Sequence, residues 1–65
     1  MRLKKIIIKD YARIGNNATL IPGIVVGKNS LVGAGSVVLS NVLDGKVVLG
    51  NPARVMWNAT KIVRK

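Results

Sequence analysis

Few side chains in this sequence are able to transfer protons. It has no His and no Cys, and its only carboxylates are Asp10 and Asp44. Both stand in turn-like sequences, where an Asp side chain commonly hydrogen-bonds the local backbone. A general base works best when its pKa lies near the operating pH, and His is the residue type that ordinarily meets this condition. We therefore expect no catalytic side chain and no metal site, and the lack of Cys excludes a disulfide.

Positive charge is the second chemical feature. Eleven Lys and Arg against two acidic residues give a net charge of +9. The cations concentrate in residues 1–13 and 46–65, which leaves the middle of the chain nearly neutral. We interpret them as solvated termini, because one Trp, one Tyr and no Phe leave few platforms on which bases could stack. Nucleic-acid or polyanion binding stays the weaker alternative.

A six-residue period organises the chain over residues 8–43. The first position of each hexad is a branched aliphatic residue: Ile8, Ile14, Leu20, Val26, Val32 and Val38. The fourth position is Asn or Gly in every hexad after the first, and these residues accept the positive φ that a type II turn requires. A period of six fits neither a helix nor an isolated strand. We predict that each hexad is a four-residue strand followed by a two-residue corner, and forms one side of a triangular coil.

Three sides make a coil of 18 residues, so residues 18 apart are expected to stack. The outward positions then form three faces. The first has Arg13, Gly15, Leu31 and Gly33; the second has Val25, Gly27, Leu43 and, if the register holds, Gly45; the third has Thr19, Ile21, Val37 and Leu39. The third face is the most apolar, so we expect Ile21, Val37 and Leu39 to lie at a subunit interface. The open ends of the prism present unpaired strand edges, and we expect the N-terminal cations and the folded-back C-terminal tail to blunt them. These cations are Arg2, Lys4 and Lys5.

Residues 1–65 are predicted to form a single domain, with clean repeats over 8–43 and a closing loop, short strand and tail over 44–65. Pro52 ends the repeat, because it cannot donate a hydrogen bond to a ladder. Residues 57–65 fit either a strand or a helix. The apolar run after the first basic residues is too short for a signal peptide, and no run is long enough to span a membrane. We expect a cytoplasmic location and no membrane partner.

Residues 8–57 resemble the C-terminal coils of hexapeptide-repeat acyltransferases, which include sugar O- and N-acetyltransferases. The most specific pieces are "IPG", "VGAGSVV" and "GNPARV". This resemblance implies an all-β fold, namely a left-handed parallel β-helix of about two coils plus a C-terminal tail. It also implies a homotrimer and acetyl-CoA as cosubstrate, bound in a groove between neighbouring prisms. The left hand rests on the resemblance alone, because the general rule favours right-handed crossovers.

The resemblance also assigns cofactor-binding residues. The amide of Ala34 would hold the pantetheine arm, Asn16 would lie one coil earlier, and Arg54 would lie near the phosphates. Ser40 is the fourth assigned residue, and it stands where relatives commonly carry a Lys. Trp57 stands where relatives often carry a second basic residue. From the repeat frame, Asn16, Ala34 and Pro52 would form one column of corner residues.

Two functions of different classes follow. The first is a fragment of a CoA-dependent acetyltransferase that carries the trimer scaffold and part of the acetyl-CoA groove. Such a fragment would not be catalytic alone, because the family uses a His upstream of these coils as general base. The second is a non-catalytic trimeric assembly module that is indifferent to coenzyme A.

Overall fold

The computed structural model describes residues 4–58, and all of its regular elements are strands. Six strands of two residues each come first: β1 (Ile7–Ile8), β2 (Arg13–Ile14), β3 (Thr19–Leu20), β4 (Val25–Val26), β5 (Leu31–Val32) and β6 (Val37–Val38). Two longer strands follow, β7 (Lys46–Gly50) and β8 (Ala53–Asn58). No helix within this part of the chain is long and apolar enough to cross a membrane.

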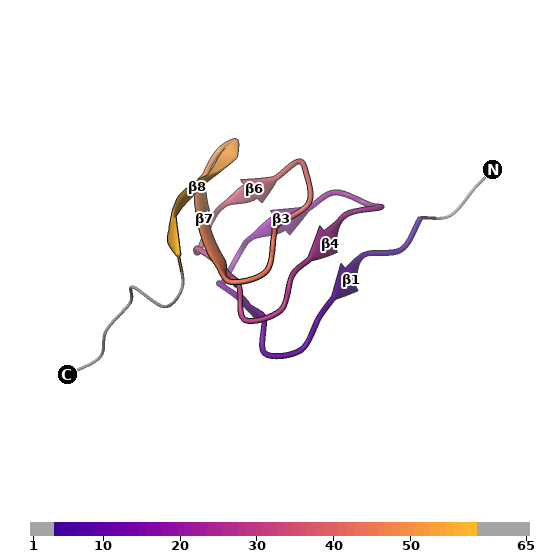
Figure 1. Cartoon of the computed structure of the whole chain (residues 1–65). Helices are drawn as coiled ribbons and strands as arrows, with labels where there is room; N and C mark the ends of the chain where they lie inside the picture. Colours follow the sequence, from indigo (N-terminus) through magenta and orange to yellow (C-terminus); the bar gives the residue numbers. More distant parts are fainter. Residues whose placement is uncertain (1–3, 59–65) are drawn as a thin grey trace.

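Strands of successive coils stack in parallel and form the three sides of a prism (Figure 1). β1 pairs with β4, β2 with β5 and β3 with β6, and in each pair the partners are 18 residues apart, as predicted. The strands are shorter than the four residues predicted, but backbone hydrogen bonds extend each ladder. At the first side, for example, the Ile7 amide donates to the Ile24 carbonyl at 3.1 Å and the Lys9 amide donates to the Val26 carbonyl at 2.9 Å.

The corners have the predicted backbone conformation at most fourth positions. Positive φ angles occur at Asn17 (61°), Gly23 (90°), Asn29 (57°) and Gly35 (72°). Tyr11 also adopts a φ of 62°, although a bulky residue is costly in this region. Asn41 does not adopt it, and its side-chain oxygen instead accepts a hydrogen bond from the Val25 amide at 2.8 Å.

The core runs along the axis of the prism. Its buried members are Ile24, Val26, Val32, Val38, Val42 and Val48. Two Ser residues at fifth positions are buried as well, and both are hydrogen-bonded, as buried hydroxyls must be. The Ser30 hydroxyl donates to the Gly27 carbonyl at 2.6 Å, and the Ser36 hydroxyl accepts from the Gly50 amide at 3.2 Å.

The third coil is two residues shorter than predicted. Val42 bridges Val26, and Val48 pairs with Val32, so both offsets are 16 residues and not 18. An offset of 18 would have placed Asp44 at the inward first position, where an unpaired carboxylate is costly. The shorter side buries Val42 instead, at 4% exposure, and leaves Asp44 at the corner.

The predicted stacking on the second face is therefore wrong. Asn41, not Leu43, lies beside Val25, and Leu43, not Gly45, lies beside Gly27. The last predicted hexad, residues 38–43, is not a full side of the coil. The six-residue step then resumes between Val42 and Val48, which the sequence pattern did not indicate.

A hairpin closes the C-terminal end of the stack. The turn predicted at Asp44 and Gly45 and the strand predicted at residues 47–49 are confirmed, the latter within β7. After the turn at Asn51 and Pro52, β8 folds back antiparallel to β7 and extends the sheet β2-β5-β7 (Figure 1). The tail therefore covers the edge of β7, as expected, and residues 57 and 58 belong to a strand. Residues 59–65 and Arg2 lie outside the described part.

Exposed apolar side chains concentrate at the two ends of the stack more than on the third face. On that face Leu39 is 52% exposed, whereas Ile21 and Val37 are half-buried and Ile21 packs against the core. The largest exposed groups at the ends are Ile6, Ile7, Ile8, Val55, Met56 and Trp57. Ile8 pairs with the buried Val26 and shares its inward face, but it is 49% exposed because no described coil covers it on the other side.

Candidate functional site

Three edges run along the prism, each a column of stacked corners. We name each edge after one of its corner residues. They are the Lys28 edge (residues 10–11, 28–29 and 44–45), the Ala34 edge (residues 16–17 and 34–35) and the Pro22 edge (residues 22–23 and 40–41). On the Lys28 and Ala34 edges, successive corners are joined by backbone hydrogen bonds. The Gly35 amide, for example, donates to the Asn16 carbonyl at 2.9 Å.

The three edges differ in the backbone amides that they offer. On the Lys28 edge, the Lys28 amide donates to the Asp44 carboxylate at 2.8 Å. On the Pro22 edge, Pro22 has no amide hydrogen. On the Ala34 edge, the amides of Asn16 and Ala34 have no hydrogen-bond acceptor among residues 4–58. This edge therefore presents two successive unpaired donors, on corners that are both exposed.

The Ala34 amide is open because of the residue above it. The register of β5 with β7 places Gly50, which has no side chain, over Ala34. The same register places Asp44 over Lys28, where its carboxylate caps the amide. Pro52, which was predicted to continue the column of Asn16 and Ala34, does not lie there. The shortened third coil puts Gly50 in that place.

Gly15 lets the first coil approach the Ala34 backbone closely. A Cβ on Gly15 would lie 2.5 Å from the Ala34 nitrogen and 2.7 Å from its Cα. No real side chain tolerates such distances, so Gly is required at this position. The Ala34 corner is thereby held by the coil beneath it, which favours a fixed direction for its amide.

Arg54 lies near this edge, on the same sheet. It pairs with Leu49 across the β7–β8 ladder. Leu49 in turn fills the space beside Gly33, since a Cβ on Gly33 would overlap the Leu49 side chain. Gly33 directly precedes Ala34, so the structure brings Asn16, Ala34 and Arg54 to one end of the sheet β2-β5-β7-β8.

Ser40 is not part of this group. It lies on the Pro22 edge, separated from Ala34 by the side of the prism that contains β6. It is exposed, like Asn16, Ala34 and Arg54. The roles assigned to these four residues remain predictions.

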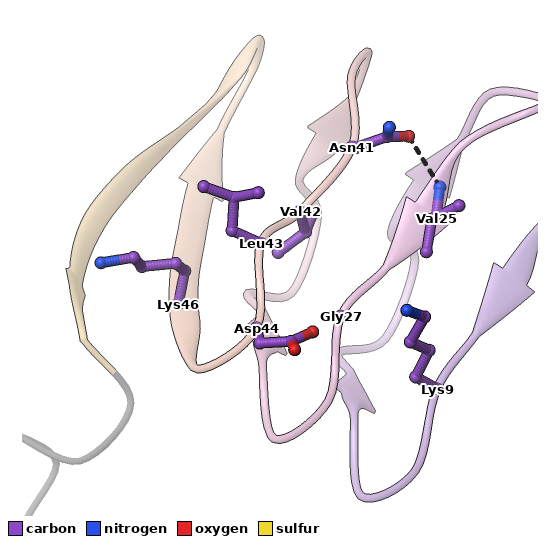
Figure 2. Close-up of a pocket in the computed structure, with 8 residues that line it drawn as sticks. All are labelled: Lys9, Val25, Gly27, Asn41, Val42, Leu43, Asp44 and Lys46. Carbon is purple, nitrogen blue, oxygen red and sulfur yellow. Dashed lines mark hydrogen bonds between the residues drawn. The ribbon is translucent and has the colours of Figure 1, made fainter.

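A shallow hollow of about 550 Å³ lies on a different part of the surface, over the side made by β1 and β4 (Figure 2). It is lined by Lys9, Val25, Gly27, Asn41, Val42, Leu43, Asp44 and Lys46. The shortened third coil creates it, because residues 41–44 cross over β4 at this point. None of the predicted cofactor residues lines it.

The polar groups of this hollow are largely engaged in holding the coils together. One Asp44 oxygen accepts the Lys28 amide, the Asn41 oxygen accepts the Val25 amide, and the Lys46 ammonium donates to the Asn58 side chain at 2.6 Å. Figure 2 shows the Asn41 bond across the hollow. A ligand here would have to compete with these bonds, so we favour the Ala34 edge as the functional site.

The family resemblance assigned a role to the Ala34 corner, but neither it nor the hexad frame revealed what distinguishes this corner from the others. The capping of Lys28 by Asp44 depends on the 16-residue offset, which the hexad frame did not reveal. One signal was present: an inward Asp44 would have been unfavourable, and this argued for a slip of the frame.

Comparisons with known proteins agree with this architecture. A model of the family "Bacterial transferase hexapeptide (six repeats)" matches residues 5–40. A putative acetyltransferase, YvoF, of Bacillus subtilis (strain 168) is 41% identical over 56 residues, which cover 86% of this chain and 33% of that protein. The 2,3,4,5-tetrahydropyridine-2,6-dicarboxylate N-acetyltransferase of Staphylococcus aureus (strain JH9) is 42% identical over 57 residues, which cover 88% of this chain and 24% of that enzyme. The chain thus spans a third or less of the length of these two relatives.

The fold is likewise shared with solved structures. The hexapeptide-repeat acetyltransferase VCA0836 from Vibrio cholerae O1 biovar eltor, complexed with acetyl coenzyme A, superposes with a TM-score of 0.83 at 38% identity. The superposition covers 85% of this chain and 30% of that one. The predicted fold class, a left-handed parallel β-helix, is confirmed.

Proposed function

The chain belongs to the bacterial transferase hexapeptide family, and we propose that it forms the acetyl-CoA-binding part of an acetyltransferase. The observation that carries this proposal is the pair of unpaired, exposed amides of Asn16 and Ala34 on an edge that no described residue covers. Relatives named as acetyltransferases, one of them complexed with acetyl coenzyme A, support the choice of ligand.

The Ala34 edge suits the pantetheine arm of the coenzyme. That arm is extended and carries amide carbonyls, which need donors spaced along a line. Asn16 and Ala34 are neighbours across a parallel ladder, and adjacent strands lie about 4.8 Å apart. Two donors at this spacing are able to fix the arm along the prism axis. Arg54, at the end of the same sheet, would bind phosphate through its guanidinium group.

These residues bind and orient the donor, but they do not supply the proton transfer. The sequence has no His, and the Asp44 carboxylate is bonded to the Lys28 amide. We propose that the general base of the complete enzyme lies outside the residues of this chain. Losing a general base typically slows a reaction by about 10²- to 10⁴-fold, so the chain by itself should transfer acetyl groups very slowly.

We also propose a cytoplasmic homotrimer that associates through the face of Ile21, Val37 and Leu39. The half-exposed Leu39 supports this face, since an aliphatic side chain is better covered than left in water. A purely structural trimer is the competing function, and it would use the same face without binding coenzyme A.

Calorimetric titration with acetyl-CoA, with free acetate as control ligand, distinguishes these functions. Micromolar binding of acetyl-CoA that weakens about tenfold in Arg54→Ala is the expected result, because an arginine–phosphate pair is a strong charge-assisted bond. An absence of binding at millimolar acetyl-CoA would leave only the structural role.

A further inference from the structure

A bulge in the β7–β8 hairpin places Arg54 and Trp57 on the same face. Leu49 pairs with Arg54 and Val48 with Val55, but Val47 pairs with Trp57, so Met56 is an extra residue in β8. Without this extra residue, side chains three positions apart on a strand would point to opposite faces. Bulges of this kind redirect side chains. This bulge places the Trp57 indole on the same face of the strand as the Arg54 guanidinium group.

The face that the two residues share is the outer one. Val48 belongs to the core cluster, so Val47 and Leu49, which flank it in β7, point away from the core. Val47 is 4% exposed although it is not a member of that cluster, which indicates cover on the outer side. Cross-strand partners share a face, so Trp57 and Arg54 also lie there.

Trp57 is more exposed than a purely structural role requires. It remains 46% exposed, and it is the only Trp of the chain. The cross-strand partners of Arg54 and Trp57, Leu49 and Val47, lie two residues or about 6.8 Å apart along β7. An exposed indole and an exposed guanidinium group at this spacing on one face present an aromatic surface near a cation. Nucleotides have the complementary chemistry, because a base stacks on aromatic rings while its phosphates pair with Arg.

We propose that Trp57 stacks on the adenine ring of coenzyme A while Arg54 binds its phosphates. The pair then forms a nucleotide subsite that makes this chain prefer CoA thioesters to acyl-pantetheines without the nucleotide. This inference rests on the proposed function. Within this chain the nucleotide affinity should come from β8, because Ser40 lies on the Pro22 edge and not beside Arg54 and Trp57.

The single Trp makes the subsite directly observable. Adenosine 3′,5′-bisphosphate and acetyl-CoA should both quench the fluorescence of Trp57, whereas acetyl-pantetheine should not. Calorimetry should show that Trp57→Ala weakens acetyl-CoA binding about 5- to 100-fold, the range expected for loss of one base–aromatic stack. Trp57→Phe should restore most of this affinity, and acetyl-pantetheine should bind Trp57→Ala and the wild type equally.

Met56→Ala is the matched control, because Met56 is the neighbouring residue of the bulge and is 47% exposed. It should leave acetyl-CoA affinity unchanged. Equal acetyl-CoA binding by Trp57→Ala and the wild type would overturn the inference but leave the proposed function standing. A parallel loss of acetyl-pantetheine binding in Trp57→Ala would also overturn it, by showing a structural effect. If the wild type bound no acetyl-CoA, both proposals would fail.

Discussion

The Asp44 carboxylate accepts a hydrogen bond from the Lys28 amide at 2.8 Å, across 16 residues of chain. The bond exists because the shortened third coil places Asp44 over Lys28. With an 18-residue offset, Asp44 would have faced the core. The same shift places Gly50 over Ala34, so one change of register caps the Lys28 amide and leaves the Ala34 amide without a cap.

Replacing Asp44 should therefore destabilise the third coil. We expect Asp44→Ala to lower the free energy of unfolding by about 1–2 kcal/mol, since a net hydrogen bond to a charged group contributes about this much near the surface. Asp44→Asn keeps an acceptor at the same place and should cost less than half as much. Urea unfolding at one fixed protein concentration measures both. Equal losses in the two variants would mean that the charge, and not the hydrogen bond, stabilises the corner.

Gly15, directly before the Ala34 edge, should be less replaceable than Gly35 on that edge. Its Cβ would lie 2.5 Å from the Ala34 nitrogen, so Gly15→Ala forces the two coils apart, and we expect a loss above about 2 kcal/mol. Gly35→Ala is the control on this edge. Gly35 has a φ of +72° but no atom within 4 Å of its Cβ position, so only backbone strain of about 1 kcal/mol is expected. Thermal unfolding of both variants gives the ranking, and a reversed order would contradict the close approach.

The sequence pattern was sufficient for the fold up to Val38 because the inward aliphatic residues and the corner Asn and Gly residues agree in period. It failed beyond Val38 because a corner of normal length there would have buried Asp44, and tertiary packing favoured Val42. Local turn preferences also misjudged two positions. Tyr11 takes a positive φ without the usual residue type, and Asn41 uses its side chain to bond Val25.

The candidate site was predictable only in part. Ala34 and Asn16 were placed on one edge by the 18-residue spacing, which holds between the first two coils. The neighbours that decide their chemistry, Gly50 above and Gly15 below, depend on the third coil and on close backbone contact. The pairing of Trp57 with Arg54 depends on a one-residue bulge, and no pattern in β8 marks its position.

Tyr11 offers a way to stabilise the chain. It is 80% exposed and has a φ of 62°, a conformation that Asn17 and Asn29 adopt at equivalent corners. Tyr11→Asn should raise the free energy of unfolding by about 0.5–1 kcal/mol, because Asn tolerates this region better. The reverse exchange, Asn29→Tyr, should lower it by a similar amount. Urea midpoints of the two variants test this, and a destabilised Tyr11→Asn would show that the Tyr11 ring makes contacts worth more than the strain.

Leu39 should be required for the proposed trimer. We expect Leu39→Glu to shift the chain to monomers, because it places a charge on a half-exposed aliphatic position of the proposed interface. Leu43→Glu is the control, since Leu43 is 66% exposed on the face of the shallow hollow. Sedimentation velocity measures the mass of each variant. A trimer that persists in Leu39→Glu, or dissociates only in Leu43→Glu, would move the interface to another face.

The Ala34 amide can be removed without changing the corner. Pro22 occupies the equivalent first position of another corner, so the backbone there accepts the φ that Pro imposes. Ala34→Pro should therefore fold but bind acetyl-CoA about three- to tenfold more weakly, the effect of one lost hydrogen bond. Ala34→Ser keeps the amide and should bind as the wild type does. Calorimetry gives the affinities, and circular dichroism with the unfolding midpoint on the same samples verifies the fold. A folded Ala34→Pro with undiminished affinity would show that the coenzyme does not use this amide.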